Sequence, residues 1–448
     1  MICTSRSVQH VFFYQCCLLG VWVGASALAG EWPQFRGPHA NGHAATDGLP
    51  VSWSESQNVA WKVPVAGQGH SSPVIANGQI WLTTAVATKL TDEQKKSQLA
   101  HVKNPKELEL VGSVSLRALC FDATSGRQLQ DIELFAVEKP EPIHYTNTYA
   151  SPTPVIQADK LIAHFGSYGT ACIECSTGEV LWHNNDLWVD HQNGPGSSPL
   201  VWQDLILFHM DGIDQQFIAA LHLSDGSLAW KTERSGTMHP QPEMKKAYGT
   251  PVVVETPRGA ELVSPAANWV YGYDPRTGSE LWKVHYGELG FSTVPCPVIG
   301  NEMAYVCTSF GKTQLLAVKY GGQGDVSESH IVWKNDSQIP KKPSLLLVGQ
   351  ELIVCNDTGI VTCLNALTGD EVWRARVGGN FSASPLLAGD LVYLFDQDGL
   401  TTVLRAGRKF EVVAKNQLSE GCHASAAVDD QALIVRTNSQ LYRIEQLR

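Results

Sequence analysis

The chain has 448 residues, of which 43% are hydrophobic and 17% are charged, so it carries enough apolar material for a large buried core. Its 33 Lys and Arg residues stand against 44 Asp and Glu residues, which gives a formal charge of −11. Nucleic acids and anionic membrane surfaces require clustered Lys and Arg, so this acidic balance argues against both as the main partner.

The first 29 residues are typical of a secretory signal peptide. An apolar stretch over residues 11–28 follows Arg6, and Ala27 and Ala29 supply the small side chains that a signal peptidase reads. A membrane anchor is the alternative, but the sequence becomes polar directly after this stretch. We therefore expect an exported protein, periplasmic or secreted, with no membrane span after cleavage.

Residues 30–57 precede the repeats described below and contain the segment EWPQFRGP. We expect Trp32, Phe35 and Arg36 to hold this N-terminal segment against the rim of the domain that follows. The alternative role for these three side chains is ligand binding.

A repeat runs through the remainder of the chain, from residue 58 to residue 448. Each unit opens with a small residue, often followed by Pro, ahead of a short apolar strand. Except for a first interval of 81 residues, the openings lie 39–52 residues apart, which is the period of a four-stranded propeller blade. The openings are Ser72-Pro73, Thr153-Pro154, Ser198-Pro199, Thr250-Pro251, Cys296-Pro297, Leu345-Leu346, Ser384-Pro385 and Ser425-Ala426.

Most units also end in the same way, with a tight turn followed by a strand that carries a tryptophan. A small polar residue before Gly suits such turns, because Gly accepts the positive φ that they require. We expect the tryptophans to fill the widening gap between blades. The turns are Ser125-Gly126, Thr177-Gly178, Asp225-Gly226, Thr277-Gly278 and Thr368-Gly369, and the tryptophans are Trp182, Trp230, Trp282, Trp333 and Trp373.

The last unit lacks its fourth strand, and a spare strand precedes the first unit. Val59, Trp61, Val63 and Val65 alternate with other residues in this spare strand. We predict that residues 58–65 complete the last blade and close the ring, because closure removes exposed sheet edges. The predicted fold is all-β, an eight-bladed propeller of four-stranded antiparallel blades. Seven blades remain the alternative, because the last two units lack the tryptophan.

A charged insertion at residues 88–110 interrupts the first unit and explains the long first interval. We expect a short helix capped by Asp92 and running through Leu99. A solvated excursion and a partner-binding arm are the two interpretations of this insertion.

Eight cysteines follow the predicted signal peptide, at one or two per unit. Buried free thiols are one interpretation. Cross-strand pairs are the other, with Cys296 opposite Cys307 and Cys355 opposite Cys363 as the candidates.

The repeat, written here as ACIECSTGEVLW over residues 171–182, resembles the pyrroloquinoline-quinone-like (PQQ-like, BamB-type) propeller repeat. The segments at residues 31–38 and 58–82 resemble the opening of bacterial exported proteins of that superfamily. The resemblance covers the whole mature chain and implies the propeller fold.

The superfamily contains two functional branches. Quinoprotein dehydrogenases hold the quinone with Ca²⁺ over the propeller axis, stacked on a disulfide between adjacent cysteines. After the predicted signal this chain has no adjacent cysteines, so we expect no cofactor and no metal. The BamB-type branch binds partner proteins, and it implies a binding scaffold. PQQ with Ca²⁺ belongs only to the alternative, a quinoprotein alcohol or sugar dehydrogenase.

In a propeller, the loops before each first strand and those between the second and third strands share one face, where function usually lies. Six histidines fall at or before first strands and raise a metal site as one alternative: His70, His144, His191, His239, His285 and His423. The candidate binding residues on this face are His70, Tyr149, Tyr168, Tyr248, Trp269, Phe291, Lys312, Phe381 and His423.

The sequence shows no nucleophile elbow, no HExxH motif and no P-loop, so no catalytic residue is predicted. The leading hypothesis is a non-catalytic, monomeric exported propeller that binds a protein or a saccharide-like ligand through its loop face.

Overall fold

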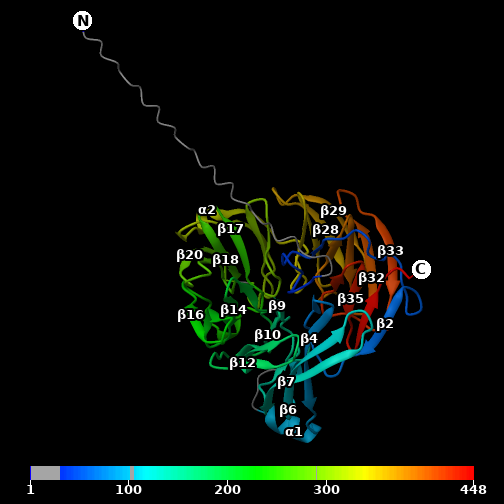
Figure 1. Cartoon of the computed structure of the whole chain (residues 1–448). Coiled ribbons are helices and arrows are strands. Elements are labelled where there is room, and N and C mark those ends of the chain that lie inside the picture. The colour runs from blue at the N-terminus through cyan, green and yellow to red at the C-terminus, as the bar shows by residue number, and fades with distance from the viewer. Residues whose placement is uncertain (2–30, 101–104, 289, 448) are drawn as a thin grey trace.

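The computed structural model describes Met1 and residues 31–100, 105–288 and 290–447, and the predicted signal peptide apart from Met1 lies outside these residues. Eight antiparallel sheets of four core strands each are arranged in a ring (Figure 1). The first strands of successive sheets contact one another near the axis, and the later strands lie progressively outward. The predicted eight-bladed propeller is therefore confirmed, and the seven-bladed alternative is excluded.

In each blade the four strands lie in chain order from the axis outward, except that β2 is the outermost strand of blade 8. Blades 1 and 2 consist of β3 (Val74–Ala76), β4 (Gln79–Thr88), β6 (Ser113–Asp122) and β7 (Gln128–Glu138), then β9 (Val155–Gln157), β10 (Lys160–His164), β11 (Thr170–Glu174) and β12 (Val180–Asn184). Blades 3 and 4 consist of β13 (Leu200–Trp202), β14 (Leu205–Asp211), β15 (Gln216–His222) and β16 (Leu228–Glu233), then β17 (Val252–Thr256), β18 (Gly259–Pro265), β19 (Trp269–Tyr273) and β20 (Glu280–His285).

The second half of the ring repeats this arrangement. Blades 5 and 6 consist of β21 (Val298–Gly300), β22 (Met303–Cys307), β23 (Leu315–Lys319) and β25 (Ile331–Asn335), then β26 (Leu346–Val348), β27 (Glu351–Cys355), β28 (Ile360–Asn365) and β29 (Glu371–Arg376). Blades 7 and 8 consist of β30 (Leu386–Ala388), β31 (Leu391–Phe395), β32 (Leu400–Arg405) and β33 (Val412–Gln417), then β34 (Ala427–Asp429), β35 (Ala432–Arg436), β36 (Gln440–Ile444) and β2 (Val59–Pro64).

Blade 8 joins the two ends of the chain. Its outermost strand, β2, comes from the N-terminal side and pairs antiparallel with β36, with Val59 opposite Ile444 and Pro64 opposite Gln440. The blue and red segments accordingly lie side by side in Figure 1. The predicted closing strand is confirmed, so the ring is held by backbone hydrogen bonds rather than by a covalent link.

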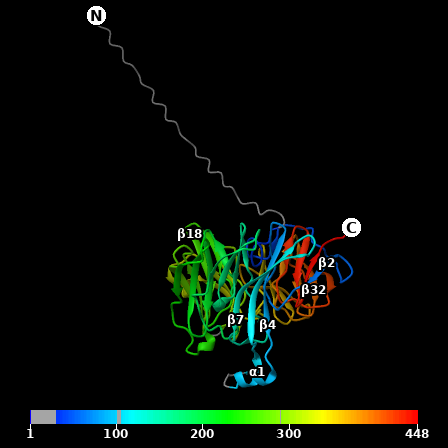
Figure 2. The ribbon, with the colours of Figure 1, turned by 60° about the horizontal axis from the view of Figure 1, so that its bottom comes forward.

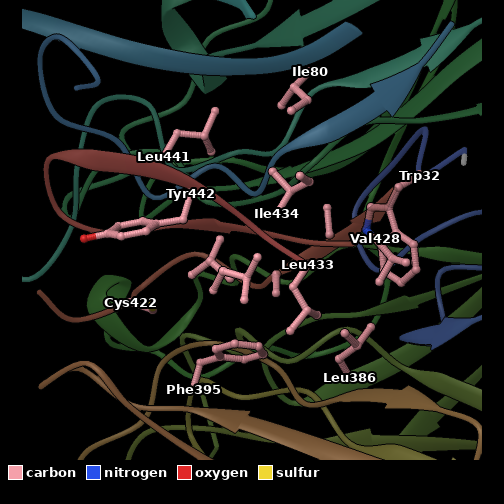
Figure 3. Close-up of a cluster of buried hydrophobic side chains, with 14 of the residues drawn as sticks. Trp32, Ile80, Leu386, Phe395, Cys422, Val428, Leu433, Ile434, Leu441 and Tyr442 are labelled. Atoms are coloured by element: carbon pink, nitrogen blue, oxygen red, sulfur yellow. The ribbon is translucent and has the colours of Figure 1, made fainter. Parts of the chain in front are cut away.

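The hydrophobic core lies between blades rather than within them. Each of the seven buried clusters combines side chains from consecutive blades. The largest cluster spans blades 7, 8 and 1, and it includes Phe395, Leu433, Ile80 and Trp32 (Figure 3). Closure of the ring is therefore reinforced by a shared apolar core that also takes in the N-terminal segment.

The tryptophans of the outer strands fasten each blade to the next one. Five indole N–H groups donate to a carbonyl oxygen in the turn before the outermost strand of the following blade, at 2.9–3.3 Å. The pairs are Trp61 with Ala123, Trp182 with Leu223, Trp230 with Pro275, Trp333 with Ala366 and Trp373 with Gly407. Trp282 differs, because its indole N–H donates to Glu261 of its own blade at 2.7 Å.

The N-terminal segment crosses the ring from its axis to its outer edge. Trp32 exchanges backbone hydrogen bonds with Ile75 at 2.8 and 2.9 Å, and β1 (His43–Ala44) pairs parallel with β30, the innermost strand of blade 7. Further along, the backbone N–H of Trp53 donates to Asn416 on the outermost strand of that blade at 2.9 Å. The sequence placed this segment on the rim, whereas its first half contacts the innermost strands.

The insertion of blade 1 projects out of the ring on extended strands β4 and β6, with helix α1 (Asp92–Gln98) at its tip (Figures 1 and 2). The helix forms as expected, but its N-cap is Thr91 rather than Asp92. The Thr91 hydroxyl accepts from the backbone N–H of Gln94, and the Gln94 side chain accepts from the Thr91 backbone, which is a capping box. No residue of α1 is buried.

Other short elements decorate the ring. β5 (Leu108–Glu109) pairs with β8 (Ile143–His144), and β24 (Gly324–Asp325) adds a parallel strand to blade 4. A second helix, α2, spans Ser327–His330, and three single-turn 3₁₀ helices span Pro105–Glu107, Gly166–Tyr168 and Pro242–Met244. Within the described residues, no helix has the length and apolar character needed to cross a membrane.

The eight cysteines after the predicted signal are all buried and free. Cys307 pairs with Leu315 across the sheet, and Cys355 pairs with Val361, so the two candidate cysteine pairs are not opposite one another. Burial raises the pKa of each thiol, and it raises that of Cys422 to about 12. These thiols therefore stay protonated.

The tryptophan contact predicts how two matched glycines will respond to substitution. Gly226 and Gly78 both have a φ of 72°, but a methyl group at Gly226 would overlap with the Trp182 ring, whereas at Gly78 it would meet no atom within 4 Å. Gly78→Ala should lower the free energy of unfolding by about 1 kcal/mol through backbone strain alone. Gly226→Ala should cost about 1–3 kcal/mol more, because it displaces the indole.

Urea unfolding of the two variants checks this prediction. Equal losses of stability in Gly226→Ala and Gly78→Ala would show that the tryptophan contact does not fasten the blades.

Candidate functional site

A cavity of about 940 Å³ lies on the axis of the ring. Its walls come from the loops before the first strands and, in blades 1 and 5, from the loop between the second and third strands. These loops form the face that the sequence analysis selected. The volume falls within the range of pockets that enclose a small molecule.

The lower wall of the cavity is a ring of hydroxyl groups, which we call the hydroxyl ring. Each member lies two residues before the first strand of its blade, and its side chain accepts a hydrogen bond from the backbone N–H of the corresponding residue one blade earlier. Seven such bonds of 2.9–3.1 Å run in one direction around the axis. The acceptors are Thr153, Ser198, Thr250, Ser344, Ser384, Ser425 and Ser72. In blade 5, Cys296 holds this position.

A second ring of side chains lies above the first, because residues two apart in an extended chain point to the same side. All eight blades contribute to this upper ring, and every member lines the cavity. In blade order the members are His70, Ser151, Gly196, Tyr248, Val294, Lys342, Ser382 and His423.

The upper ring contains two groups of side chains that differ in chemistry and lie on opposite sides of the axis. Lys342, His423 and His70 come from blades 6, 8 and 1 and form what we call the basic arc. Gly196, Tyr248 and Val294 come from blades 3, 4 and 5 and form the apolar arc across the axis.

The imidazoles of His70 and His423 stack with ring centroids 4.5 Å apart and planes 10° from parallel. Burial, with smaller contributions from His423, Arg436 and Lys342, holds the pKa of His70 well below its usual value. Burial and Lys342 likewise lower the pKa of His423. Both rings are therefore neutral at neutral pH, which allows two like groups to stack.

A buried guanidinium lies behind this stacked pair. Arg436 is 2% exposed and donates to the carbonyl and hydroxyl of Ser71 and to the carbonyl of Thr83 at 2.7–3.0 Å. No carboxylate of the described residues forms an ion pair with it. Burial lowers its pKa to about 9, so the group remains cationic at neutral pH and makes this side of the cavity positive.

The mouth of the cavity has the opposite charge over blades 1–4. Glu107, Glu141, Asp190 and Glu243 line it and form what we call the acidic rim. Lys246 lies among them, donating to Gln192 at 2.5 Å and to the Glu243 carbonyl at 2.7 Å. Burial lowers the pKa of Lys246 to about 8, although Glu243 and Asp190 partly offset this effect.

The insertion of blade 1 reaches the mouth of the cavity. Its end forms β5, which pairs with β8 in the loop before blade 2. Through this pairing Glu107 and Leu108 line the cavity next to Glu141 and His144. The insertion is thus a solvated projection at its tip and part of the cavity wall at its base.

The floor of the cavity is formed by the N-terminal segment. Phe35 lines the cavity from below, and its neighbour Pro33 accepts a hydrogen bond from the backbone N–H of Ile156 on β9 at 2.7 Å. Arg36 is 2% exposed and donates to the carbonyl oxygens of Leu345 and Asn41. Of the three side chains singled out in the sequence, Trp32 and Arg36 are buried and Phe35 faces the cavity.

The structure brings together four of the nine candidate residues. His70, Tyr248, Phe291 and His423 all line the cavity. The Tyr248 hydroxyl donates to the carbonyl of His191 at 2.6 Å, which fixes its ring in the wall.

The other five candidates do not line the cavity. Tyr149 and Tyr168 pack edge to face at 5.9 Å, and Trp269 and Phe381 are buried between blades. Lys312 lies on the surface, where its ammonium is 3.5 Å from Asp336. Trp269 begins strand β19 rather than lying in a loop, and it contributes to the core between blades 3 and 4.

The six histidines do not converge on one point. His70, His144 and His423 line the cavity, whereas the other three do not. His191 accepts from the backbone N–H of Ser167, His239 accepts from the backbone N–H of Gln241, and His285 packs on Trp269. Among the residues that the structure describes, no group of three His, Cys, Asp or Glu side chains is placed to hold a metal ion.

Two features of the site were missed in the sequence. Blade 6 was aligned on Leu345, but its member of the hydroxyl ring is Ser344, one residue earlier, and β26 begins two residues later as in the other blades. The wrong register hid Lys342, which occupies the position of His70 and His423. The small residue at each opening was the available signal, because it recurs for the hydrogen bond that it accepts.

Comparison with known proteins gives a family. Residues 43–232 and 325–445 match the family model described as "Outer membrane protein assembly factor BamB". The chain belongs to this family of PQQ-like β-propellers. The recognition of the PQQ-like, BamB-type repeat in the sequence is confirmed.

Two curated relatives are similar over part of their length. Outer membrane protein assembly factor BamB from Legionella pneumophila (strain Paris) is 24% identical over 43% of this chain and 49% of its own. Tetrathionate hydrolase from Acidithiobacillus ferrooxidans is 24% identical over 54% of this chain and 48% of its own. The chain spans about half the length of the curated relatives that it matches.

Solved structures share the fold. BamB from Moraxella catarrhalis superposes with a TM-score of 0.54 at 12% identity, covering 86% of this chain and 99% of its own. Quinohemoprotein alcohol dehydrogenase from Comamonas testosteroni superposes with a TM-score of 0.53 at 10% identity, covering 94% of this chain and 81% of its own. At such low identity these likenesses establish the fold alone.

The cavity residues do not fit a quinone held with Ca²⁺. Ca²⁺ takes six to eight oxygen ligands. The carboxylates of the cavity are spread over the acidic rim, and within the described chain none of them belongs to a group of three potential metal ligands. Cysteines on the described strands are not adjacent in sequence, so the stacking disulfide has no counterpart there.

The hydroxyl ring predicts the stability of two matched valine variants. Thr153→Val removes the acceptor of the Ser72 N–H and leaves that buried group unpaired, so we expect a loss of about 1–3 kcal/mol. Thr362 is 1% exposed, and its hydroxyl has no hydrogen-bond partner, so Thr362→Val should leave stability unchanged or increase it.

Urea unfolding midpoints of the two variants measure this difference. If Thr362→Val were as damaging as Thr153→Val, the loss would reflect the shape of the side chain and not the hydrogen bond of the ring.

Proposed function

We propose that this chain is an exported, non-catalytic scaffold that binds a protein partner on the loop face around the cavity. The observation that carries the proposal is a set of exposed aromatic side chains at the mouth. Tyr145, Trp188 and Phe310 are 62%, 51% and 40% exposed, and each lies within two residues of, or is itself, a residue that lines the cavity.

These three side chains come from three different blades. Tyr145 precedes blade 2, Trp188 precedes blade 3, and Phe310 lies between β22 and β23 of blade 5. Large aromatic side chains are costly to expose, and Trp and Tyr dominate the binding energy of protein interfaces. A rigid ring that presents them on loops suits recognition of a folded or extended partner.

The relatives favour a protein as the partner. The BamB relative is named as an outer membrane protein assembly factor, so its described role is exercised on other proteins. The predicted signal peptide would export this chain across the inner membrane, to the side on which outer membrane proteins are assembled.

Capture from the exported-protein fraction tests the proposal with a matched pair of variants. We expect wild-type bait to enrich a specific protein, and Tyr145→Ala/Trp188→Ala to lose at least about tenfold of it, because each hot-spot truncation costs about 1–2 kcal/mol. The control is Phe410→Ala, since Phe410 is 38% exposed in the turn between β32 and β33, on the opposite face.

Quantitative mass spectrometry of the eluates gives the readout. Equal recovery with wild type and the double variant would contradict binding at the mouth. Equal loss with Phe410→Ala would show that recovery depends on general surface properties rather than on the loop face.

A further inference from the structure

The interior of the cavity and its mouth have opposite electrostatic character. The basic arc, whose members are half-buried, lies next to the hydroxyl ring, whereas the acidic rim is formed by exposed or half-buried loop residues that lie farther from that ring along the chain. A ligand that reaches the hydroxyl ring therefore passes carboxylates first and meets positive charge at the end of its path.

The positive charge of the basic arc is only partly neutralised. The Lys342 ammonium lies 3.7 Å from Asp357, which is longer than the roughly 2.7–2.9 Å of a charge-assisted hydrogen bond. An ammonium has three donors, so donors of Lys342 remain for a ligand. Arg436 adds a buried cation behind His70 with no carboxylate partner in the described part of the chain.

The floor and the opposite wall are suited to an uncharged body. Gly196, Tyr248 and Val294 form the apolar arc, and Phe291 and Phe35 also line the cavity. The serine hydroxyls beneath the basic arc accept hydrogen bonds from the backbone, but their O–H groups remain able to donate.

We infer that the cavity takes a monoanionic organic acid, with its acid group at the basic arc above the hydroxyl ring and its apolar body against Tyr248 and Phe291. This inference rests on the proposed binding role of the same face. A second acid group on the ligand would meet Glu107, Glu141 and Asp190 at the mouth, so the acidic rim selects against polyanions.

Two sources share this chemistry. One is a free small acid, and the other is the C-terminal carboxylate of a partner polypeptide inserted through the mouth. In both cases a single carboxylate reaches the basic arc while the remainder of the ligand is neutral or cationic at the rim.

Isothermal titration calorimetry of the full mature chain at fixed ionic strength tests the inference. The probes are benzoate, the uncharged analogue benzyl alcohol, and the dianion terephthalate. We expect saturable binding of benzoate that is at least about tenfold tighter than that of either other probe. Acetyl-Gly-Phe with a free carboxylate, compared with its C-terminal amide, shows whether a polypeptide end is accepted as well as a small acid.

A pair of lysine variants locates the binding. Lys342→Gln should weaken benzoate binding about tenfold through the loss of one charge-assisted contact. Lys312→Gln is the control, because Lys312 lies outside the cavity on the same face and contacts Asp336. Its affinity for benzoate should equal that of wild type.

Several results would overturn the inference. The first is that benzyl alcohol or terephthalate binds as tightly as benzoate. The second is that Lys342→Gln binds benzoate with unchanged affinity. The third is that benzoate shows no saturable binding up to about 10 mM, because such an affinity is too weak for a built site. Partner capture that depends on Tyr145 and Trp188 would then still support the proposed function. Acid binding without any captured protein would instead leave the inference standing and contradict the protein partner.

Discussion

The hydroxyl ring is the interaction on which the rest of the structure depends. Each first strand of blades 1–3 and 5–8 is short, with three residues in β3 and β26, so its own sheet supplies few hydrogen bonds near the axis. The serine or threonine two residues earlier accepts the N–H of the preceding blade and couples neighbouring blades where they come closest. Without this acceptor, a buried N–H at the axis would remain unpaired.

The same residues that join the blades also line the cavity. A side chain that couples two blades must face the axis, and the residue two positions earlier then faces it as well. The position of the binding cavity is therefore a consequence of ring assembly. The ligand specificity of the cavity depends on which eight side chains occupy the upper ring, and here Lys342, with the buried Arg436 nearby, makes one side positive.

The N-terminal segment adds the second constraint. Trp32 packs in the core shared by blades 7, 8 and 1, Phe35 closes the lower end of the channel, and β2 completes blade 8. One continuous stretch thereby closes the ring and makes the channel a pocket that opens on one face. Loss of closure would thus affect both the stability of the ring and the shape of the binding site.

The repeat was readable in the sequence because blade period, turns and tryptophans are local patterns. The closing strand followed from a missing strand at one end and a spare one at the other, and β2 confirms it. The site was harder to read. Phe381 lies in the expected loop but is buried between blades, and Trp269 begins strand β19 and is buried as well. Only the packing of neighbouring blades decides this. Lys342 could be recognised only with the correct register of the blade 6 unit, which lacks the proline at its opening.

An experimental crystal structure of the mature chain soaked with 4-iodobenzoate gives the most direct test of the axial cavity as the binding site. The iodine can be located by its anomalous signal. The account predicts one iodine peak inside the cavity near Phe291, with the carboxylate directed to Lys342 above the hydroxyl ring. Iodine found only outside the cavity, or a carboxylate directed to the acidic rim, would contradict it.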